Sequence, residues 1–280
     1  MNMWELTTRQ LLSLASSIWF FSNLAFWLTL LILISPLKLI PSEALQRQLV
    51  TPIAHLCYRL AVRVNSFWMQ QVVGIELKVE GTVPNHPNPV VVCNHQSWFD
   101  IPLAQELVSA KGPVLQFLIK RELIWVPIIG WICLVLNFPR LKRSGSETAR
   151  DQDLSAITDA ASALTEAPGA LFIFAEGTRF SEAKRRRQDA PYPHLLRPKI
   201  GGLSAILAQA APDTPVVDIT LSYAAGTANF WRCLHGDTPV IHIHIETIKA
   251  KDIQDVGLWL DERWQQKSTW LHSKRHQYSS

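Results

Sequence analysis

Two short polar segments, about eighty residues apart, hold side chains suited to acid–base and anion-binding chemistry. The first reads Asn-His-Gln-Ser-Trp-Phe-Asp at residues 94–100, so His95 stands five residues before Asp100. A carboxylate that accepts one imidazole N–H fixes the tautomer and stabilises the charged ring, which leaves the other nitrogen to take a proton from a hydroxyl. The pair predicts a general base, provided that the chain turns between the two residues.

The same segment also fits a structural interpretation. Ser97 and Asp100 have the spacing of a helix capping box, and Pro102 is tolerated in a first helical turn. In that case His95 would be a hydrogen-bonded loop residue without a role in chemistry. On these seven residues alone, the two interpretations are equally favoured.

The second segment is Glu176-Gly177-Thr178-Arg179. A glycine lets the backbone approach a ligand closely, and the planar guanidinium of Arg179 suits a phosphate. Glu176 has the right charge to hold that guanidinium in place. An exposed salt bridge at the end of a strand is the alternative, and this segment alone favours it.

Both segments follow buried-strand patterns, Val-Val-Val-Cys and Phe-Ile-Phe-Ala, and the carboxyl ends of strands are where α/β proteins carry their sites. Runs rich in β-branched and aromatic residues predict strands at 75–80, 89–93, 170–175, 215–223 and 239–247. Helical patterns lie near 101–109, 154–164, 203–210 and 256–272. This interleaving predicts an α/β fold with a mixed sheet flanked by helices.

The N-terminal region has a different character, because no charged residue stands between Arg9 and Lys38. About 20 apolar residues suffice for a helix to cross the hydrocarbon layer. A retained membrane helix is favoured over a cleaved signal peptide, whose apolar part is shorter, and over a buried core helix. The chain has a net charge of +4. Basic residues that follow the apolar run predict a cytoplasmic side there.

Pro36 and Pro41 end this first helix, and a second helical pattern covers residues 42–71. The second helix could lie in the membrane interface. We therefore expect an N-terminal two-helix membrane anchor over 1–72 and an α/β domain over 73–280. Another uncharged run, 123–139, is marginal for crossing and predicts a re-entrant or interface-seated segment.

The two polar segments together resemble the glycerolipid acyltransferases of the lysophosphatidic acid acyltransferase family, over residues 79–223. Segments 94–100 and 176–179 match its first and third blocks. Residues 130–143 stand where its second block ends in a basic residue, and 215–220 resemble its fourth, although Asp218 interrupts a strand that is usually apolar. Residues 195–202 resemble the lysocardiolipin-type and related bacterial branch.

The resemblance implies acyl transfer from a thioester, on coenzyme A or acyl carrier protein, to the sn-2 hydroxyl of lysophosphatidic acid. His95 and Asp100 would be catalytic, and Arg179 would hold the lipid phosphate. Glu176 would orient Arg179, with Gly177 and Thr178 in the same turn. Weaker candidates for the phosphate are Lys199 and one of Arg140, Lys142 and Arg143. No metal or cofactor is expected, because a thioester is already activated.

Other signals are weaker. The basic run 184–187 either binds lipid headgroups or forms a solvated loop. It lacks the aromatic residues of a nucleic-acid site. His242, His244 and Glu246 alternate along one strand, which favours the polar face of an antiparallel strand over a zinc site. The four cysteines have no CxxC spacing and are expected to be packing thiols.

Two alternative functions stay open. One is an acyltransferase for another lysophospholipid, such as lysophosphatidylglycerol. The other is a noncatalytic lipid-binding membrane scaffold, which would have no need of a base. The expected location is the bacterial inner membrane, with the α/β domain on the cytoplasmic side.

Overall fold

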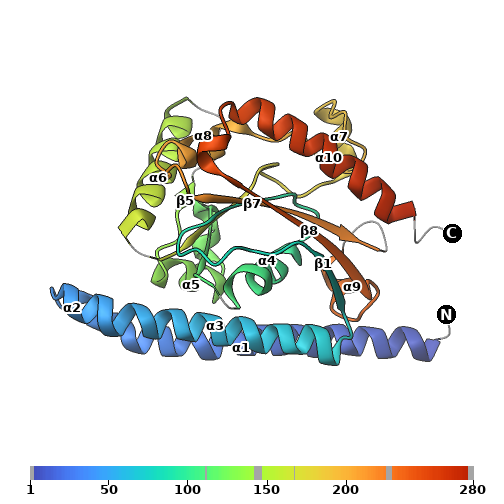
Figure 1. The fold of residues 1–280 in the computed structure, drawn as a ribbon. Helices are drawn as coiled ribbons and strands as arrows, with labels where there is room; N and C mark the ends of the chain where they lie inside the picture. Colours follow the sequence, from blue (N-terminus) through green and yellow to red (C-terminus); the bar gives the residue numbers. More distant parts are fainter. Residues whose placement is uncertain (1–2, 111, 142–146, 167, 225–228, 277–280) are drawn as a thin grey trace.

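The computed structural model describes residues 3–110, 112–141, 147–166, 168–224 and 229–276, and its centre is a six-stranded sheet (Figure 1). The strand order is β1-β8-β7-β2-β6-β3, with β7 and β8 antiparallel and the other neighbours parallel. This confirms the mixed sheet. The strands are β1 (Glu76–Glu80), β2 (Val90–Cys93), β3 (Leu115–Phe117), β6 (Ala170–Phe174), β7 (Pro215–Tyr223) and β8 (Val240–Lys249).

The sheet separates two apolar cores. In β2, Val91 and Cys93 point into one core, while Val90 and Val92 point into the other, as the two-residue period of a strand requires. The first core is closed by α4 (Asp100–Ser109) and α5 (Ile129–Val135). The second lies under α6 (Glu147–Glu166), α8 (Ile200–Leu207) and α10 (Val256–His276), on the opposite face (Figure 1). All four cysteines are buried and free, as expected of packing thiols.

The N-terminal helices form a layer outside α4 and α5 (Figure 1). The long helix α1 (Met3–Ile34) is followed by η1 (Ser35–Leu39), and the second helical stretch consists of α2 (Glu43–Leu45), η2 (Gln46–Val50), α3 (Thr51–Phe67) and η3 (Trp68–Val72). Within the described ranges, 3–39 is the one stretch with the length and hydropathy to cross a membrane, and little of it is buried. An apolar N-terminal helix is thus present, which suggests membrane association.

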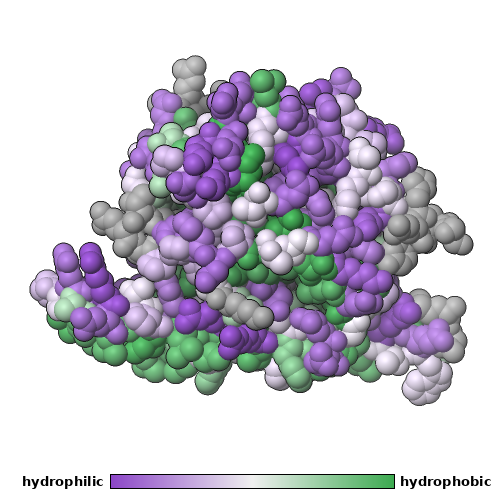
Figure 2. All heavy atoms as spheres, viewed as in Figure 1, coloured by the Kyte–Doolittle hydropathy of each residue, from purple (hydrophilic) through white to green (hydrophobic). Residues whose placement is uncertain are grey.

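Polar side chains of α1 face the rest of the protein. Ser16 donates to the carbonyl of Leu234 at 2.9 Å and accepts from the indole of Trp68 at 2.9 Å. Two turns further on, Asn23 donates to the side-chain oxygen of Asn65 at 2.9 Å. The helix is therefore held along its length. From Leu11 onward, the large exposed side chains of α1 are apolar (Leu11, Leu14, Ile18, Trp19, Phe21, Phe26, Ile32 and Leu33). Figure 2 shows a green strip along the lower edge of the molecule, where α1 and α3 lie.

The uncharged run 123–139 is not a continuous helix. It holds the end of η4 (Arg121–Trp125) and all of α5, and Val135 packs against the cluster of Leu31 and Ala54. The indole of Trp125 is 82% exposed in this segment. Contact with the N-terminal layer and an exposed tryptophan both favour an interface-seated segment, which stays a prediction.

Asp218, which interrupts the otherwise apolar strand β7, is explained by α10. Its carboxylate contacts the ammonium of Lys267 at 2.7 Å and the guanidinium of Arg263 at 2.8 Å. Arg263 also pairs with Glu246 of β8. Lys267 has no exposed side-chain surface, and it donates as well to the carbonyl of Ile219 at 2.6 Å. The departure from an apolar strand is thus an ion-pair attachment of α10 to the sheet.

We expect Asp218→Ala to lower the free energy of unfolding by about 3–5 kcal/mol, because it leaves the Lys267 ammonium buried without its carboxylate. The matched control is Asp213→Ala, which removes an exposed carboxylate from Lys249 and Lys251 and should cost less than about 1 kcal/mol. Denaturant unfolding in detergent measures both. Equal losses in the two variants would contradict the interpretation.

Candidate active site

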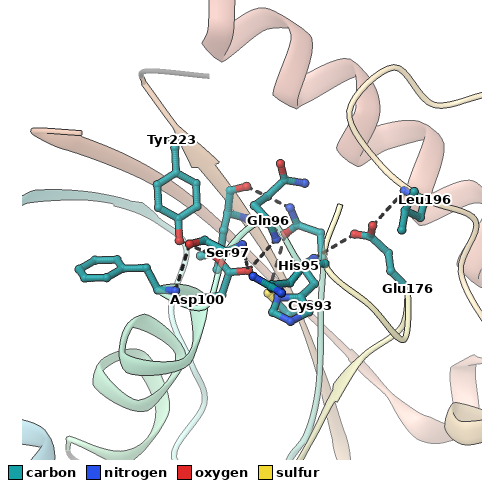
Figure 3. A network of polar contacts seen from close by, with 12 residues as sticks. Cys93, His95, Gln96, Ser97, Asp100, Glu176, Leu196 and Tyr223 are labelled. Carbon is teal, nitrogen blue, oxygen red and sulfur yellow. Dashed lines mark hydrogen bonds and ion pairs between the residues drawn. The ribbon is translucent and has the colours of Figure 1, made fainter. Parts of the chain in front are cut away.

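His95 and Asp100 meet at the carboxyl end of β2. The chain leaves the sheet at Cys93, turns, and starts α4 at Asp100. The turn brings His95 Nδ1 to 2.8 Å from Asp100 Oδ2 (Figure 3). The predicted hydrogen-bonded contact between imidazole and carboxylate is therefore confirmed.

The Asp100 carboxylate is fully buried and accepts four hydrogen bonds. Besides His95, the backbone N–H groups of Gln96 and Ser97 donate to Oδ2 at 2.6 and 2.9 Å. The hydroxyl of Tyr223 donates to Oδ1 at 2.5 Å. The carboxylate thus makes one of the two bonds of the predicted capping box, from the N–H of Ser97, and also binds the imidazole. The second bond of the box is not made, because the Ser97 hydroxyl accepts from the N–H of Phe99 instead of that of Asp100. The two interpretations are compatible.

Sequence reasoning missed Tyr223. It is the last residue of β7, which runs parallel to β2, so the ends of the two strands lie together. Burial raises the pKa of the Tyr223 hydroxyl well above its usual value, with the nearby Asp100 charge as a further cause, so the group remains a donor. A polar ring at the end of a buried strand was the available signal.

The imidazole of His95 lies against an aromatic floor. Its ring stacks on Phe174 with centroids 3.7 Å apart and planes at 10°. Only 10% of the His95 side-chain surface is exposed. Its Nε2 has no hydrogen-bond partner within the described ranges. With Nδ1 bound to Asp100, this second nitrogen is the position at which a substrate hydroxyl could be deprotonated.

The predicted pairing of Glu176 with Arg179 is wrong. Glu176 is fully buried, and Oε1 accepts from the backbone N–H of His95 at 2.9 Å while Oε2 accepts from that of Leu196 at 2.9 Å (Figure 3). Buried N–H groups need acceptors, and these two outcompete a guanidinium that can remain in solvent. Glu176 joins the turn of residues 94–99, the candidate catalytic turn, to the loop that contains Leu196.

Burial raises the pKa of Glu176 to about 8, although the N–H groups of His95 and Leu196 act in the opposite direction. Because the pKa of Glu176 is higher in the folded state, the contribution of this side chain to the free energy of unfolding depends on pH. The contribution is complete below the unfolded pKa near 4.5 and is lost as the pH rises to about 8. We expect the unfolding free energy of the wild type, relative to Glu176→Gln, to fall between pH 5 and 8. Denaturant unfolding of both proteins across this pH range measures the difference. A difference in unfolding free energy that does not change with pH would contradict the prediction.

Arg179 lies beside the candidate catalytic turn. Its guanidinium carbon is 4.7 Å from the centroid of the Trp98 ring, a cation–π contact. Trp98 belongs to the same turn as His95, so the cation and the imidazole occupy one end of the sheet. Sequence reasoning did not assign Trp98 a role, and the contact depends on two segments far apart in the chain.

The other residues of the Glu-Gly-Thr-Arg turn are held by two lysines. Gly177 has φ +67°, and a Cβ there would come within 3.1 Å of the ammonium of Lys199, so the lysine packs across the glycine. Lys184 donates to the hydroxyl of Thr178 at 2.9 Å and to the carbonyl of Arg179 at 2.8 Å. Lys199 is therefore beside the turn, as expected of a phosphate candidate.

Two expectations about basic residues change. Residues 184–187 are part of a short helix, α7 (Glu182–Arg187), and not a loop. In Figure 1, α7 lies on the opposite side of the sheet from α1 and α3. This position disfavours binding of α7 to lipid headgroups at the apolar layer. Arg143 and Lys142 lie outside the described residues, whereas Arg140 is exposed in β5 (Arg140–Leu141).

The alternating polar residues of β8 have structural partners. Glu246 accepts from Arg263 at 2.6 Å, and His244 is 3.5 Å from Glu246. The strand pairs antiparallel with β7. The interpretation as the polar face of an antiparallel strand agrees with these contacts.

A histidine–aspartate pair at the end of β2, with an arginine beside it, defines an enzyme-like site on an α/β fold. A family model described as Acyltransferase matches residues 75–222, more than half of the chain. The chain therefore belongs to the acyltransferase family. The matched range includes both polar segments that the sequence analysis singled out.

Similar proteins agree with this assignment. The chain is 28% identical over 184 residues to a 1-acyl-sn-glycerol-3-phosphate acyltransferase of Cocos nucifera, covering 66% of this chain and 53% of that protein. It is 24% identical over 276 residues to 1-acyl-sn-glycerol-3-phosphate acyltransferase 2 of Arabidopsis thaliana, covering 87% and 70%. The crystal structure of the 1-acyl-sn-glycerophosphate acyltransferase PlsC from Thermotoga maritima has the same fold, with a TM-score of 0.58 and 19% identity over 94% of this chain and 98% of that one.

Proposed function

We propose that the protein transfers a fatty acyl group from an acyl thioester to the sn-2 hydroxyl of lysophosphatidic acid, giving phosphatidic acid. The observation that carries the proposal is the 2.8 Å contact of His95 Nδ1 with Asp100, which leaves Nε2 available in a turn whose Trp98 contacts Arg179. The printed activity of the relatives supports the same acceptor.

In the proposed reaction, His95 Nε2 takes the proton of the acceptor hydroxyl as its oxygen attacks the thioester carbonyl. Asp100 stabilises the resulting imidazolium. The carbon–sulfur bond then breaks, and the proton leaves with the thiol. Arg179 and Lys199 would bind the phosphate of the acceptor, because Arg179 contacts Trp98 of the catalytic turn and Lys199 packs against Gly177, two residues from Arg179. No step of the proposed reaction requires a metal or a cofactor.

The test is a thiol-release assay with purified protein in detergent. Acyl-CoA and acyl carrier protein thioesters are offered separately as donors. Lysophosphatidic acid, lysophosphatidylglycerol and a lysocardiolipin are offered as acceptors. We expect the highest kcat/KM with lysophosphatidic acid. A higher value with another acceptor would replace the proposed substrate, and lysolipid binding without thiol release would favour the noncatalytic scaffold.

We place the protein at a membrane, with α1 lying in the interface and not crossing it. Ser16 and Asn23, two turns apart, are bonded to the protein, and a helix that crossed would have to break these contacts. Apolar side chains of the same helix point outward. The proposed site is the bacterial inner membrane, with the α/β domain on the cytoplasmic side.

Thr8→Cys and Lys38→Cys variants test this orientation, because both side chains are polar and exposed near opposite ends of the apolar stretch 3–39. An impermeant maleimide added to sealed vesicles from the side of the α/β domain should label both positions. Labelling of one end only would mean that the helix crosses. The native cysteines are buried and give a low background.

A further inference from the structure

The C-terminal helix α10 lies outside the range that the family model matches, yet it reaches the catalytic turn. Its apolar residues Leu260, Trp264 and Leu271 are fully buried against the sheet. Lys267 ties the same helix to Asp218 and to the backbone of β7. These contacts fix the course of the helix, so its last turns have a defined place beside the site.

Arg275, in the last turn of α10, contacts two loops of the site. One guanidinium nitrogen donates to the side-chain oxygen of Gln96 at 3.1 Å, and the other contacts Nδ1 of His194 at 3.2 Å. The amide nitrogen of Gln96 in turn donates to the carbonyl of His194 at 2.9 Å. The three residues form a closed triangle, and Gln96 directly follows the catalytic base.

The protonation of His194 agrees with this triangle. A guanidinium can only donate, so Nδ1 of His194 must be an unprotonated acceptor. Burial lowers the pKa of His194 to about 4, with the charge of Arg275 as the next cause. The imidazole is therefore neutral at neutral pH and can accept the hydrogen bond from Arg275.

The catalytic turn is thus joined to one loop at two successive residues. The N–H of His95 is linked through the carboxylate of Glu176 to the N–H of Leu196. The side chain of Gln96 is linked to His194, two residues before Leu196, both directly through its own amide nitrogen and through Arg275. The first link is made by a fully buried side chain, and the second is reinforced from another part of the chain, the C-terminal helix. Two adjacent attachments restrict rotation of the turn more than one does.

We infer that Arg275 is a positioning residue, which acts through Gln96 to hold the catalytic turn so that His95 keeps its place over Phe174 and beside Asp100. The inference rests on the proposed acyltransferase reaction. A guanidinium suits this role because its planar fork can serve two acceptors in fixed directions, which an ammonium on a flexible stem cannot.

The role differs from two simpler ones. If Arg275 bound the phosphate of a substrate, its loss would raise KM and leave kcat unchanged. If it only stabilised the end of α10, its loss would lower the melting temperature without affecting kcat of the folded enzyme. Misplacement of a base by about 1 Å can cost on the order of 100-fold in rate, so the inferred role acts on kcat.

The experiment is a double-mutant cycle with Arg275→Met, Gln96→Leu and the combined variant, assayed by thiol release at saturating substrates. We expect Arg275→Met to lower kcat by about 10- to 100-fold with both KM values within about threefold of the wild type. In the Gln96→Leu background, the same change should lower kcat by no more than about threefold, because its partner is already absent. Arg275→Lys should restore only part of the loss.

Lys274→Met is the matched control. It removes one positive charge from the neighbouring residue of the same helix, but Lys274 pairs with Glu80 of β1, so kcat should stay within about twofold of the wild type. An Arg275→Met enzyme with wild-type kcat would overturn the inference. Raised KM at unchanged kcat, or losses that multiply in the cycle, would do the same.

Hydrogen exchange separates this inference from the proposed function. Arg275→Met should speed exchange at the backbone amides of Gln96 and Ser97 at least severalfold, while Lys274→Met leaves them unchanged. This result does not depend on which lysolipid is the acceptor. If the wild type released no thiol with any acceptor, the proposed function would fail, and unchanged exchange in Arg275→Met would still overturn the positioning role.

Discussion

Replacing His95 by alanine is expected to lower kcat for acyl transfer by about 10²–10⁴-fold, the range that a positioned general base contributes. Within the described residues, Nε2 of this imidazole has no hydrogen-bond partner and is available to a substrate hydroxyl. The backbone N–H of residue 95 remains to donate to Glu176, so the turn keeps its attachment. The measurement is thiol release at saturating lysophosphatidic acid and acyl-CoA.

His244→Ala is the matched control for this change. It deletes the same side chain from β8, where His244 lies near Glu246, and its kcat should stay within about twofold of the wild type. Both variants should retain binding to vesicles and the circular dichroism of the wild type. A His95→Ala enzyme that keeps more than a tenth of the wild-type kcat would remove His95 from the mechanism.

The second large effect is expected at Asp100. Asp100→Asn should lower kcat by about 10³–10⁴-fold, the order of loss when the aspartate of a catalytic triad is replaced by asparagine. The fold should tolerate the change. The amide oxygen can still accept from His95 and the two backbone N–H groups, while the amide nitrogen can donate to the oxygen of Tyr223.

Two further variants separate charge from hydrogen bonding at Asp100. Tyr223→Phe removes one donor and keeps the carboxylate, so kcat should fall by no more than about tenfold. Asp100→Ala removes the acceptor of four donors and should lower both kcat and the unfolding free energy. A kcat for Asp100→Asn within tenfold of the wild type would mean that the carboxylate is structural only.

Some of the fold was predictable because it depends on local patterns. The runs at β2 and β6 are uniformly apolar because both faces of these strands are buried, and that is visible in four or five residues. The short strand β3 was missed, since three residues are too few to show a period. The helix α7 was taken for a loop because its run of basic residues has no apolar face.

In the site, sequence alone identified the candidate side chains, namely His95, Asp100 and Arg179, and predicted that each follows a strand. The tertiary structure decided their partners. Glu176 was paired by charge with its neighbour in sequence, but burial directs it to backbone N–H groups of His95 and Leu196. The physical reason is that a desolvated polar group takes whichever partner the packing brings to it, however distant that partner is in the chain.

The same reason accounts for Tyr223 and Arg275. Each lies more than a hundred residues from the catalytic turn it contacts, and no periodicity in the sequence relates them to it. The parallel pairing of β7 with β2 brings Tyr223 to Asp100, and the burial of α10 on the sheet brings Arg275 to Gln96. Residue types and strand ends are properties of the sequence, whereas contacts between distant segments exist only once the two cores have formed.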